Sequence, residues 1–158
     1  MDNNIITEIR VASMDDLVPL FKESLSQGRS VKFKPKGISM LPMLRQDRDT
    51  VTLSPITEKL RKYDVVLYRR DNGKYVLHRI VKTGKTYTMM GDNQFVKEYG
   101  IRIDQIIAVV TAFTRDQKEY AMDSATQKIY CRLRYHSRFL RRGYRALKHR
   151  VKRILKMR

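Results

Sequence analysis

The segment that decides the fold is residues 64–81, which read DVVLYRRDNGKYVLHRIV. Two runs of β-branched and apolar residues, 65–69 and 74–81, stand on either side of the dipeptide Asn72-Gly73. Asn-Gly favours a tight hairpin turn, because both residues tolerate the positive φ angles that such turns need. The pattern therefore predicts an antiparallel hairpin formed by residues 65–69 and 74–81.

Similar short runs on both sides of this hairpin predict a chain that is mainly β. With the hairpin strands included, they fall at residues 30–35, 50–53, 64–68, 75–81, 86–90 and 106–113. Turn residues separate the runs, as is typical of antiparallel sheets. Residues 5–11 also alternate, and we expect them to form a short edge strand or an extended lead-in.

One helix is expected before the strands, at residues 15–27. Ser13 is suited to cap its N-terminus, Asp15 and Asp16 provide an acidic first turn, and Gly28 ends the pattern. Together with the strands, this helix predicts an α+β fold that is mainly β.

Composition bounds the class of protein. The chain has 158 residues, about one domain, and its single Cys excludes an intramolecular disulfide. Its longest uninterrupted apolar stretch, 106–110, is far shorter than the roughly 20 residues of a membrane-spanning helix. Residues 1–4 lack the basic start of a secretory signal. We therefore expect a cytoplasmic chain, free or attached peripherally to the inner face of the membrane.

Charge divides the chain into two parts. The net charge is +18, yet residues 1–123 hold 21 Lys and Arg against all 16 Asp and Glu. Residues 124–158 hold 13 Lys and Arg and no acid. We therefore expect a body at 1–123, carrying the N-terminal helix, and a basic tail at 124–158.

The tail has the pattern of an amphipathic helix, with Gly143 as the position where it could bend. Its seam is Tyr130, Leu133, Ser137, Leu140, Tyr144, Leu147, Val151 and Ile154. Such a helix suits an anionic membrane surface. Nucleic acid or an acidic leader peptide is an alternative partner, and a seam packed on the body is a third interpretation. The sequence leaves membrane docking and its alternatives equally open.

Three segments carry residues suited to peptide hydrolysis. Ser39 follows a predicted strand, with Gly37 before it and Pro42 after it, so it is either an exposed nucleophile or an ordinary turn residue. His78 shares a strand face with apolar neighbours and is either a general base or a histidine satisfied by a polar partner. The polar turn at residues 90–98 carries two carboxylates that could orient an imidazole, or it is a solvated loop.

Four motifs follow one another in order: Ser39-Met40-Leu41-Pro42, Asp64-Val65-Val66, His78-Arg79-Ile80 and Gly91-Asp92-Asn93. This set resembles that of type I signal peptidases and their relatives, the LexA-type self-cleaving repressors. The resemblance covers residues 31–110, about half of the chain. His followed by Arg is similar to the endoplasmic-reticulum, archaeal and sporulation-type branch, which uses Ser and His. The resemblance implies a signal-peptidase/LexA-like folded sheet. Signal peptidases have a membrane anchor, and we expect this chain to depart from them as a member without one.

The resemblance also implies roles for individual residues. Ser39 is expected to be the nucleophile and, through its backbone N–H, an oxyanion donor, while His78 is the general base. Glu98 occupies the place of the family's acid, which is usually Asp, and Asp92 is the alternative. Met40 and Pro42 are expected to contact the substrate.

The chain also departs from the family pattern. Gly37 replaces a hydroxyl residue found two positions before the nucleophile in the bacterial enzymes, and Tyr63 replaces the Gly usual before Asp-Val-Val. Among the remaining candidates, Cys131 is expected to be a buried or idle thiol, and His136 and His149 are expected at the surface. No cofactor or metal is expected.

These observations predict a serine endopeptidase that cuts a short extended segment of a precursor or leader peptide. The alternative is a non-catalytic or regulatory module that binds a peptide and uses its tail to bind a membrane or nucleic acid. Residues 1–30 provide only one good helix, which argues against the helix-turn-helix domain of a repressor.

Overall fold

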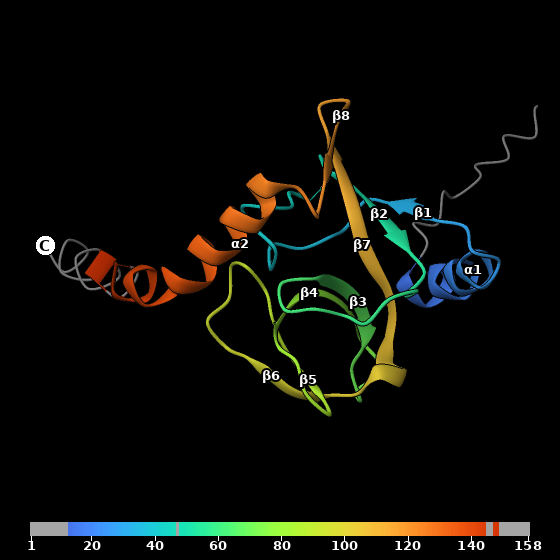
Figure 1. The fold of residues 1–158 in the computed structure, drawn as a ribbon, viewed down its shortest axis with the longest axis horizontal. Coiled ribbons are helices and arrows are strands. Elements are labelled where there is room, and N and C mark those ends of the chain that lie inside the picture. Colours follow the sequence, from blue (N-terminus) through green and yellow to red (C-terminus); the bar gives the residue numbers. More distant parts are fainter. Residues whose placement is uncertain (1–12, 47, 145–146, 149–158) are drawn as a thin grey trace, which may run out of the picture.

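The computed structural model describes residues 13–46, 48–144 and 147–148, and Figure 1 shows their arrangement. The helices are α1 (Met14–Ser26), the short 3₁₀ helix η1 (Ile103–Gln105) and α2 (Ala125–His136). The strands are β1 (Val31–Phe33), β2 (Thr50–Ser54), β3 (Val65–Arg69), β4 (Tyr75–Lys82), β5 (Tyr87–Met90), β6 (Glu98–Ile101), β7 (Ile106–Arg115) and β8 (Lys118–Ala121). The predicted lead-in at 5–11 lies outside the described residues.

The strands form one antiparallel sheet of eight, in the order β1-β2-β7-β3-β4-β5-β6, with β8 paired to β7. The hairpin predicted at the start is confirmed: β3 and β4 pair with Val65 opposite Arg79 and Arg69 opposite Tyr75. Gly73 has a φ of +84° in the turn that joins them. The prediction of a mainly β, α+β chain is confirmed at this level.

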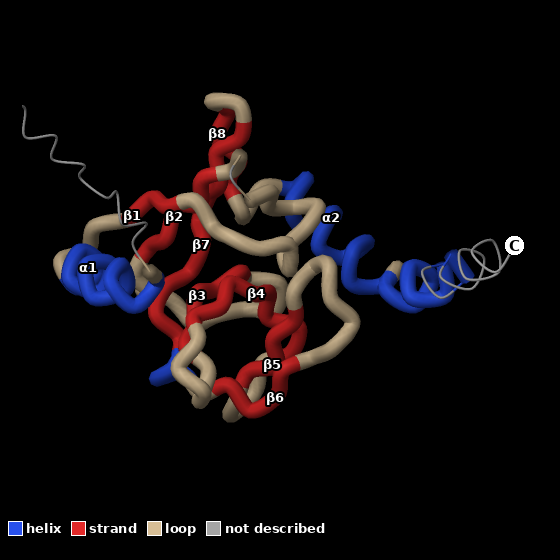
Figure 2. The backbone as a smooth tube through the Cα atoms, turned by 180° about the vertical axis from the view of Figure 1, so that it is seen from behind, coloured by secondary structure: helices blue, strands red, loops and turns tan. Residues whose placement is uncertain are grey.

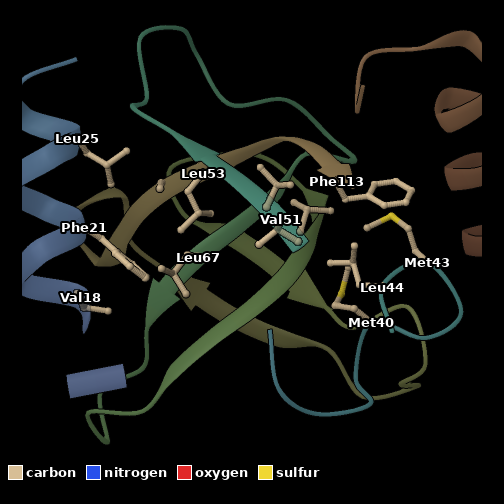
Figure 3. Packing of buried hydrophobic residues seen from close by; sticks show 13 residues of the cluster. Val18, Phe21, Leu25, Met40, Met43, Leu44, Val51, Leu53, Leu67 and Phe113 are labelled. Carbon is tan, nitrogen blue, oxygen red and sulfur yellow. The ribbon is translucent and has the colours of Figure 1, made fainter. Parts of the chain in front are cut away.

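The core lies on both sides of the sheet. In β3, Val65 and Leu67 belong to the larger cluster, which contains residues of α1, while Val66 and Tyr68 belong to a second cluster. Figure 3 shows the larger cluster, with Leu67 among its labelled residues. Alternate residues of a strand face opposite sides, so a strand buried on both faces reads as a continuous apolar run. This arrangement explains why the sequence of β3 is apolar without interruption.

Helix α1 begins as predicted. The Ser13 hydroxyl accepts a hydrogen bond from the Asp16 N–H, and the Asp16 carboxylate accepts one from the Ser13 N–H, which together form a capping box. The helix spans Met14–Ser26, within one residue of the prediction at each end. Its buried side chains, Val18, Phe21 and Leu25, close one side of the larger cluster.

The tail differs from its prediction in two ways. The helix is interrupted at Ser137 and resumes over 138–144, so Gly143 lies within a helical turn. The seam packs on the body only at its start over the described residues: Tyr130 packs against the larger cluster, whereas Leu133, Leu140, Tyr144 and Leu147 are exposed. Packing of the seam on the body is therefore confirmed for Tyr130 and wrong for the four exposed residues. Figures 1 and 2 show α1 and α2 at opposite ends of the body. No described helix is both long and apolar enough to cross a bilayer.

Candidate active site

Ser39 lies in the loop between β1 and β2, and buried side chains fix this loop to the body. Met40, Met43 and Leu44 are buried in the larger core cluster (Figure 3). Gly37 has a φ of +96°, which favours glycine, and its N–H donates to Gln46 Oε1 at 2.9 Å. The apolar anchors therefore hold the loop while Ser39 itself stays half-buried.

A buried ion pair holds the far end of the same loop. Arg115 of β7 donates from Nε to Asp49 Oδ1 at 2.9 Å and from Nη2 to the carbonyl of Met43 at 2.7 Å. Asp49 also accepts from the N–H of Arg45 at 2.9 Å. These bonds join the loop to the sheet and satisfy a carboxylate that is fully buried.

His78 lies on β4, with its side chain only 1% exposed, next to the carboxylate of Glu98 at the start of β6. Nδ1 lies 3.0 Å from Glu98 Oε1 and 3.2 Å from the Tyr68 hydroxyl. Tyr68 donates its hydrogen to Glu98 Oε2 at 2.9 Å. The atoms facing Nδ1 therefore present lone pairs, which favours the tautomer with its proton on Nδ1 and leaves Nε2 free to accept one.

Glu98 is held ionised by its partners. Burial alone would raise its pKa, but hydrogen bonds from Arg70 and Tyr68 bring the pKa below the ordinary value. For His78, burial lowers the pKa from its ordinary value, and the nearby Glu98 charge acts against this effect. The imidazole is therefore neutral at neutral pH, as a general base must be.

The turn at Gly91 brings His78 and Ser39 together. A Cβ added to Gly91 would lie 2.7 Å from the Ser39 carbonyl oxygen and 3.0 Å from His78 Nε2. The N–H of Asn93 donates to the same Ser39 carbonyl at 2.8 Å. Gly91 therefore has both the Ser39 backbone and His78 Nε2 as close neighbours, which places the two residues on either side of the same turn. The structure places no hydrogen bond between Ser39 and His78, both of which are described, although such bonds are often long in unliganded enzymes.

Ser39 and His78 line one cleft of about 260 Å³ between the 35–46 loop and the start of β4. Apolar walls come from Met40, Leu44 and Val76. Among the described residues, β5 pairs with β4 only from Arg79 onward, so residues 75–78 have a strand partner, β3, on one side only. The cleft thus lies beside a free strand edge, which suits an extended peptide.

The structure separates the two candidate acids. Asp92 is buried, and its carboxylate accepts hydrogen bonds from Nε and Nη2 of Arg79, each at 2.8 Å. Glu98 is the carboxylate beside His78. Strand alternation predicts an outward-facing Arg79, but its side chain is 3% exposed because α2 covers it. Sequence reasoning missed this buried pair.

Helix α2 contacts the site directly. Arg134 donates to the Asp92 carbonyl at 3.0 Å and to the Leu41 carbonyl at 3.1 Å. Cys131 is buried, which was one of the two alternatives predicted for it, and its thiol accepts a hydrogen bond from Arg79. These contacts cross the predicted boundary at residue 123 and tie the tail to the loops that carry Ser39 and Gly91.

Other predicted residues lie less centrally. Met40 lines the cleft, with most of its side chain in the core, while Pro42 is exposed and does not line that cleft. Their substrate contacts stay predictions. His136 is exposed, and His149 lies outside the described residues. Within the described part of the chain, no three His, Cys, Asp or Glu side chains are placed to hold a metal ion.

Two partners of Glu98, Tyr68 and Arg70, were not anticipated from the sequence. Their strand and turn were expected, but nothing in their local pattern indicates that they face a carboxylate of β6.

Comparisons with protein families, with curated proteins and with solved structures find no match for this chain.

Proposed function

We propose that this chain is a serine endopeptidase that uses Ser39 as nucleophile and His78 as general base. The observation that carries this proposal is the position of His78, whose Nδ1 lies beside Glu98 and which lines the same cleft as Ser39. We further propose that the chain is a member of the signal-peptidase and LexA-like superfamily, on the motifs quoted above.

The chemistry follows from this geometry. Ser39 Oγ attacks the scissile carbonyl carbon while His78 Nε2 takes the hydroxyl proton, and the N–H of Ser39 stabilises the resulting oxyanion. His78 then gives the proton to the leaving amine as the C–N bond breaks, which leaves an ester on Ser39. A water molecule then attacks the ester carbonyl carbon while His78 takes its proton, and His78 returns this proton to Ser39 Oγ as the ester C–O bond breaks and the new carboxyl terminus leaves. Glu98 stays ionised and stabilises the protonated imidazole.

The substrate that fits the cleft is an extended peptide segment of a precursor or leader peptide. Its backbone would lie along the free edge of β4 at residues 75–78, with alternate side chains directed into the cleft. The resemblance favours small side chains before the scissile bond.

Incubation of the full chain and of Ser39→Ala with a diverse peptide pool at mildly alkaline pH tests this proposal. Mass spectrometry should show new peptide termini with the wild type only. New termini in both samples would assign the cleavage to a contaminant or to another nucleophile.

The second candidate is a non-catalytic peptide-binding module, which the cleft beside the free edge of β4 also suits. Such a module would retain peptides from the same pool without cutting them. Equal retention by the wild type and Ser39→Ala, with no new termini in either, would support this candidate and contradict the peptidase.

A further inference from the structure

The described tail helix has two opposite faces, of which only one meets the body. The interruption at Ser137 does not break their phase, because the N–H of Ser137 donates to the Leu133 carbonyl at 2.9 Å and the N–H of Arg141 donates to the Ser137 carbonyl at 3.0 Å. Residues spaced by three and four therefore stay on one side from α2 into 138–144.

The inner face, directed at the body, is mainly polar, although Tyr130 at its border packs against the larger core cluster. Its members are Gln127, Cys131, Arg134, Arg138 and Arg141, all buried or half-buried. The outer stripe, on the other side, is apolar, with members Ile129, Leu133, Leu140, Tyr144 and Leu147. These side chains are 59% to 79% exposed. This polarity is the reverse of an ordinary surface helix, whose apolar side faces the core.

We propose that the outer stripe docks the protein on an anionic lipid surface. The charge around the stripe identifies this occupant, because residues 124–158 carry 13 Lys and Arg and no acid. Exposed Lys128, Arg132, Arg142 and Lys148 stand on the remaining faces of the described helix. An anionic lipid surface covers the leucines and neutralises these cations at the same time.

A pocket on the flank of the helix fits the same occupant. It has a volume of about 190 Å³ and is lined by Phe95, Lys97, Tyr99, Arg138, Phe139 and Arg142. Three cations match the phosphate of a lipid headgroup, and aromatic rings such as those of the exposed Tyr99 and Phe139 are typical of the membrane–water interface.

Two other occupants fit less well. Nucleic acid would neutralise the cations but leave the leucines of the outer stripe in water. A second copy of the chain would cover the leucines but bring two basic helices together without any acid in 124–158 to compensate. This inference does not depend on the peptidase proposal, because it concerns a surface outside the cleft.

The test is co-sedimentation of the full chain with phosphatidylcholine vesicles that contain or lack phosphatidylglycerol. We expect binding to the anionic vesicles, weakened by salt, and little binding to the neutral ones. Leu133→Gln with Leu140→Gln should lower the partition coefficient by about tenfold or more, because two exposed apolar side chains no longer enter the lipid.

A matched control is Leu20→Gln with Ile103→Gln, which alters exposed apolar residues on α1 and η1 and should bind like the wild type. Circular dichroism checks that each variant is folded, and Leu140→Gln alone provides a milder second variant. The same assay in the Ser39→Ala background should give the same partition, which separates this inference from the fate of the peptidase proposal.

Several results would overturn the inference. One is failure of the folded wild type to bind anionic vesicles, and another is equal binding by the leucine variants. A third is that the protein does not bind vesicles but binds duplex DNA tightly, with an affinity that the leucine substitutions leave unchanged. This result would assign the tail to nucleic acid. A wild-type dimer in analytical ultracentrifugation that the leucine variants lack would assign the outer stripe to a second copy.

Discussion

Among single residues, Gly91 provides the sharpest test of the site geometry. A Cβ at this position would lie 2.7 Å from a backbone oxygen of Ser39 and 3.0 Å from His78 Nε2. Gly91→Ala should therefore displace the two reacting residues and lower kcat by about 10²-fold, the effect of a misplacement near 1 Å. The measurement is steady-state kinetics on a peptide identified from the pool.

Gly84→Ala is the matched control for this prediction. Its Cβ would meet only the carbonyl oxygen of Thr86, at an ordinary 3.5 Å, and it lies in a turn away from the cleft. Its activity should equal that of the wild type. Full activity of Gly91→Ala would show that His78 and Ser39 do not need their present approach.

Substitutions of Asp92 and Glu98 should have different effects, one mainly on stability and the other mainly on activity. Asp92→Asn removes the charge partner of the buried Arg79 and should lower the free energy of unfolding by roughly 3–5 kcal/mol. Glu98→Gln should cost less stability, because its partner Arg70 reaches solvent, yet lower kcat by about 10²-fold through loss of the charge beside His78. Urea unfolding and kinetics measure the two effects. A folded, inactive Asp92→Asn with a fully active Glu98→Gln would reverse the assignment.

The pH dependence follows from the burial of His78. Burial lowers the pKa of His78 from its ordinary value of 6.5. We therefore expect kcat/KM to stay level through neutral pH and to fall only when the pH drops to the lowered pKa and the imidazole becomes protonated. Stability contributed by the neutral imidazole should fall over the same range, because the unfolded chain then binds the proton more readily.

Arg70→Gln should move this acidic limb to higher pH. The Arg70 charge lowers the pKa of His78, and its removal lets the pKa rise. Nuclear magnetic resonance titration of the imidazole checks the shift independently of activity. Arg69→Gln, the same change one residue earlier on an exposed side chain, is the control and should leave the limb in place. A downward shift in Arg70→Gln would contradict the account.

At the scale of elements, the link between α2 and the Ser39 loop is the feature to test. Arg134→Met keeps the apolar stem of the side chain but removes its hydrogen bonds to the Leu41 and Asp92 carbonyls. We expect kcat to fall by about tenfold with little change in KM, because the loops that carry the reacting groups shift while the cleft walls remain. Kinetics of the purified variant provides the measurement.

Arg132→Met, an exposed arginine two residues earlier, serves as the control and should be fully active. Arg134→Lys should recover part of the activity, because one ammonium can still donate to a carbonyl. A loss in KM alone for Arg134→Met would mean that α2 shapes substrate binding and leaves the position of Ser39 unaffected.

Some helices and strands could be predicted from the sequence and others could not. The β3–β4 hairpin and α1 were predictable because each has a signal in its own sequence, an Asn-Gly turn for the hairpin and a capping box for the helix. Strand β8 was missed because it follows a turn in which Asp116 and Gln117 adopt positive φ angles, a pair that does not signal a hairpin. Strand β6 was missed because its four residues, Glu98–Ile101, include a Gly with a φ of +75° and pair only with β5.

The site was predictable only in part, for the same physical reason. The motifs indicated Ser39, His78 and a following acid, but distances between separate strands are not encoded in local patterns. The contact of Glu98 with His78 depends on the β5–β6 pairing, and the burial of Arg79 depends on α2. Long-range packing of this kind leaves no periodic signal in either segment.

For the whole molecule, charge and packing divide the chain differently. The acid-free region begins at residue 124, yet α2 packs on the body through Cys131 and Arg134. The tail therefore has two roles in this account: its inner face supports the catalytic loops, and its outer stripe faces lipid. A chain cut at residue 123 should lose stability as well as membrane binding, because the contacts of Cys131 and Arg134 with Arg79 and with the Asp92 and Leu41 carbonyls would be lost.

The central claim is that Ser39 forms a covalent acyl intermediate. The most direct measurement is an acid quench of the full chain during reaction with the peptide pool, followed by mass spectrometric mapping of the modified residue. The account predicts an acyl adduct on Ser39 in the wild type and none in Ser39→Ala. Peptide cleavage that continues in Ser39→Ala, or an adduct on a different residue, would contradict it.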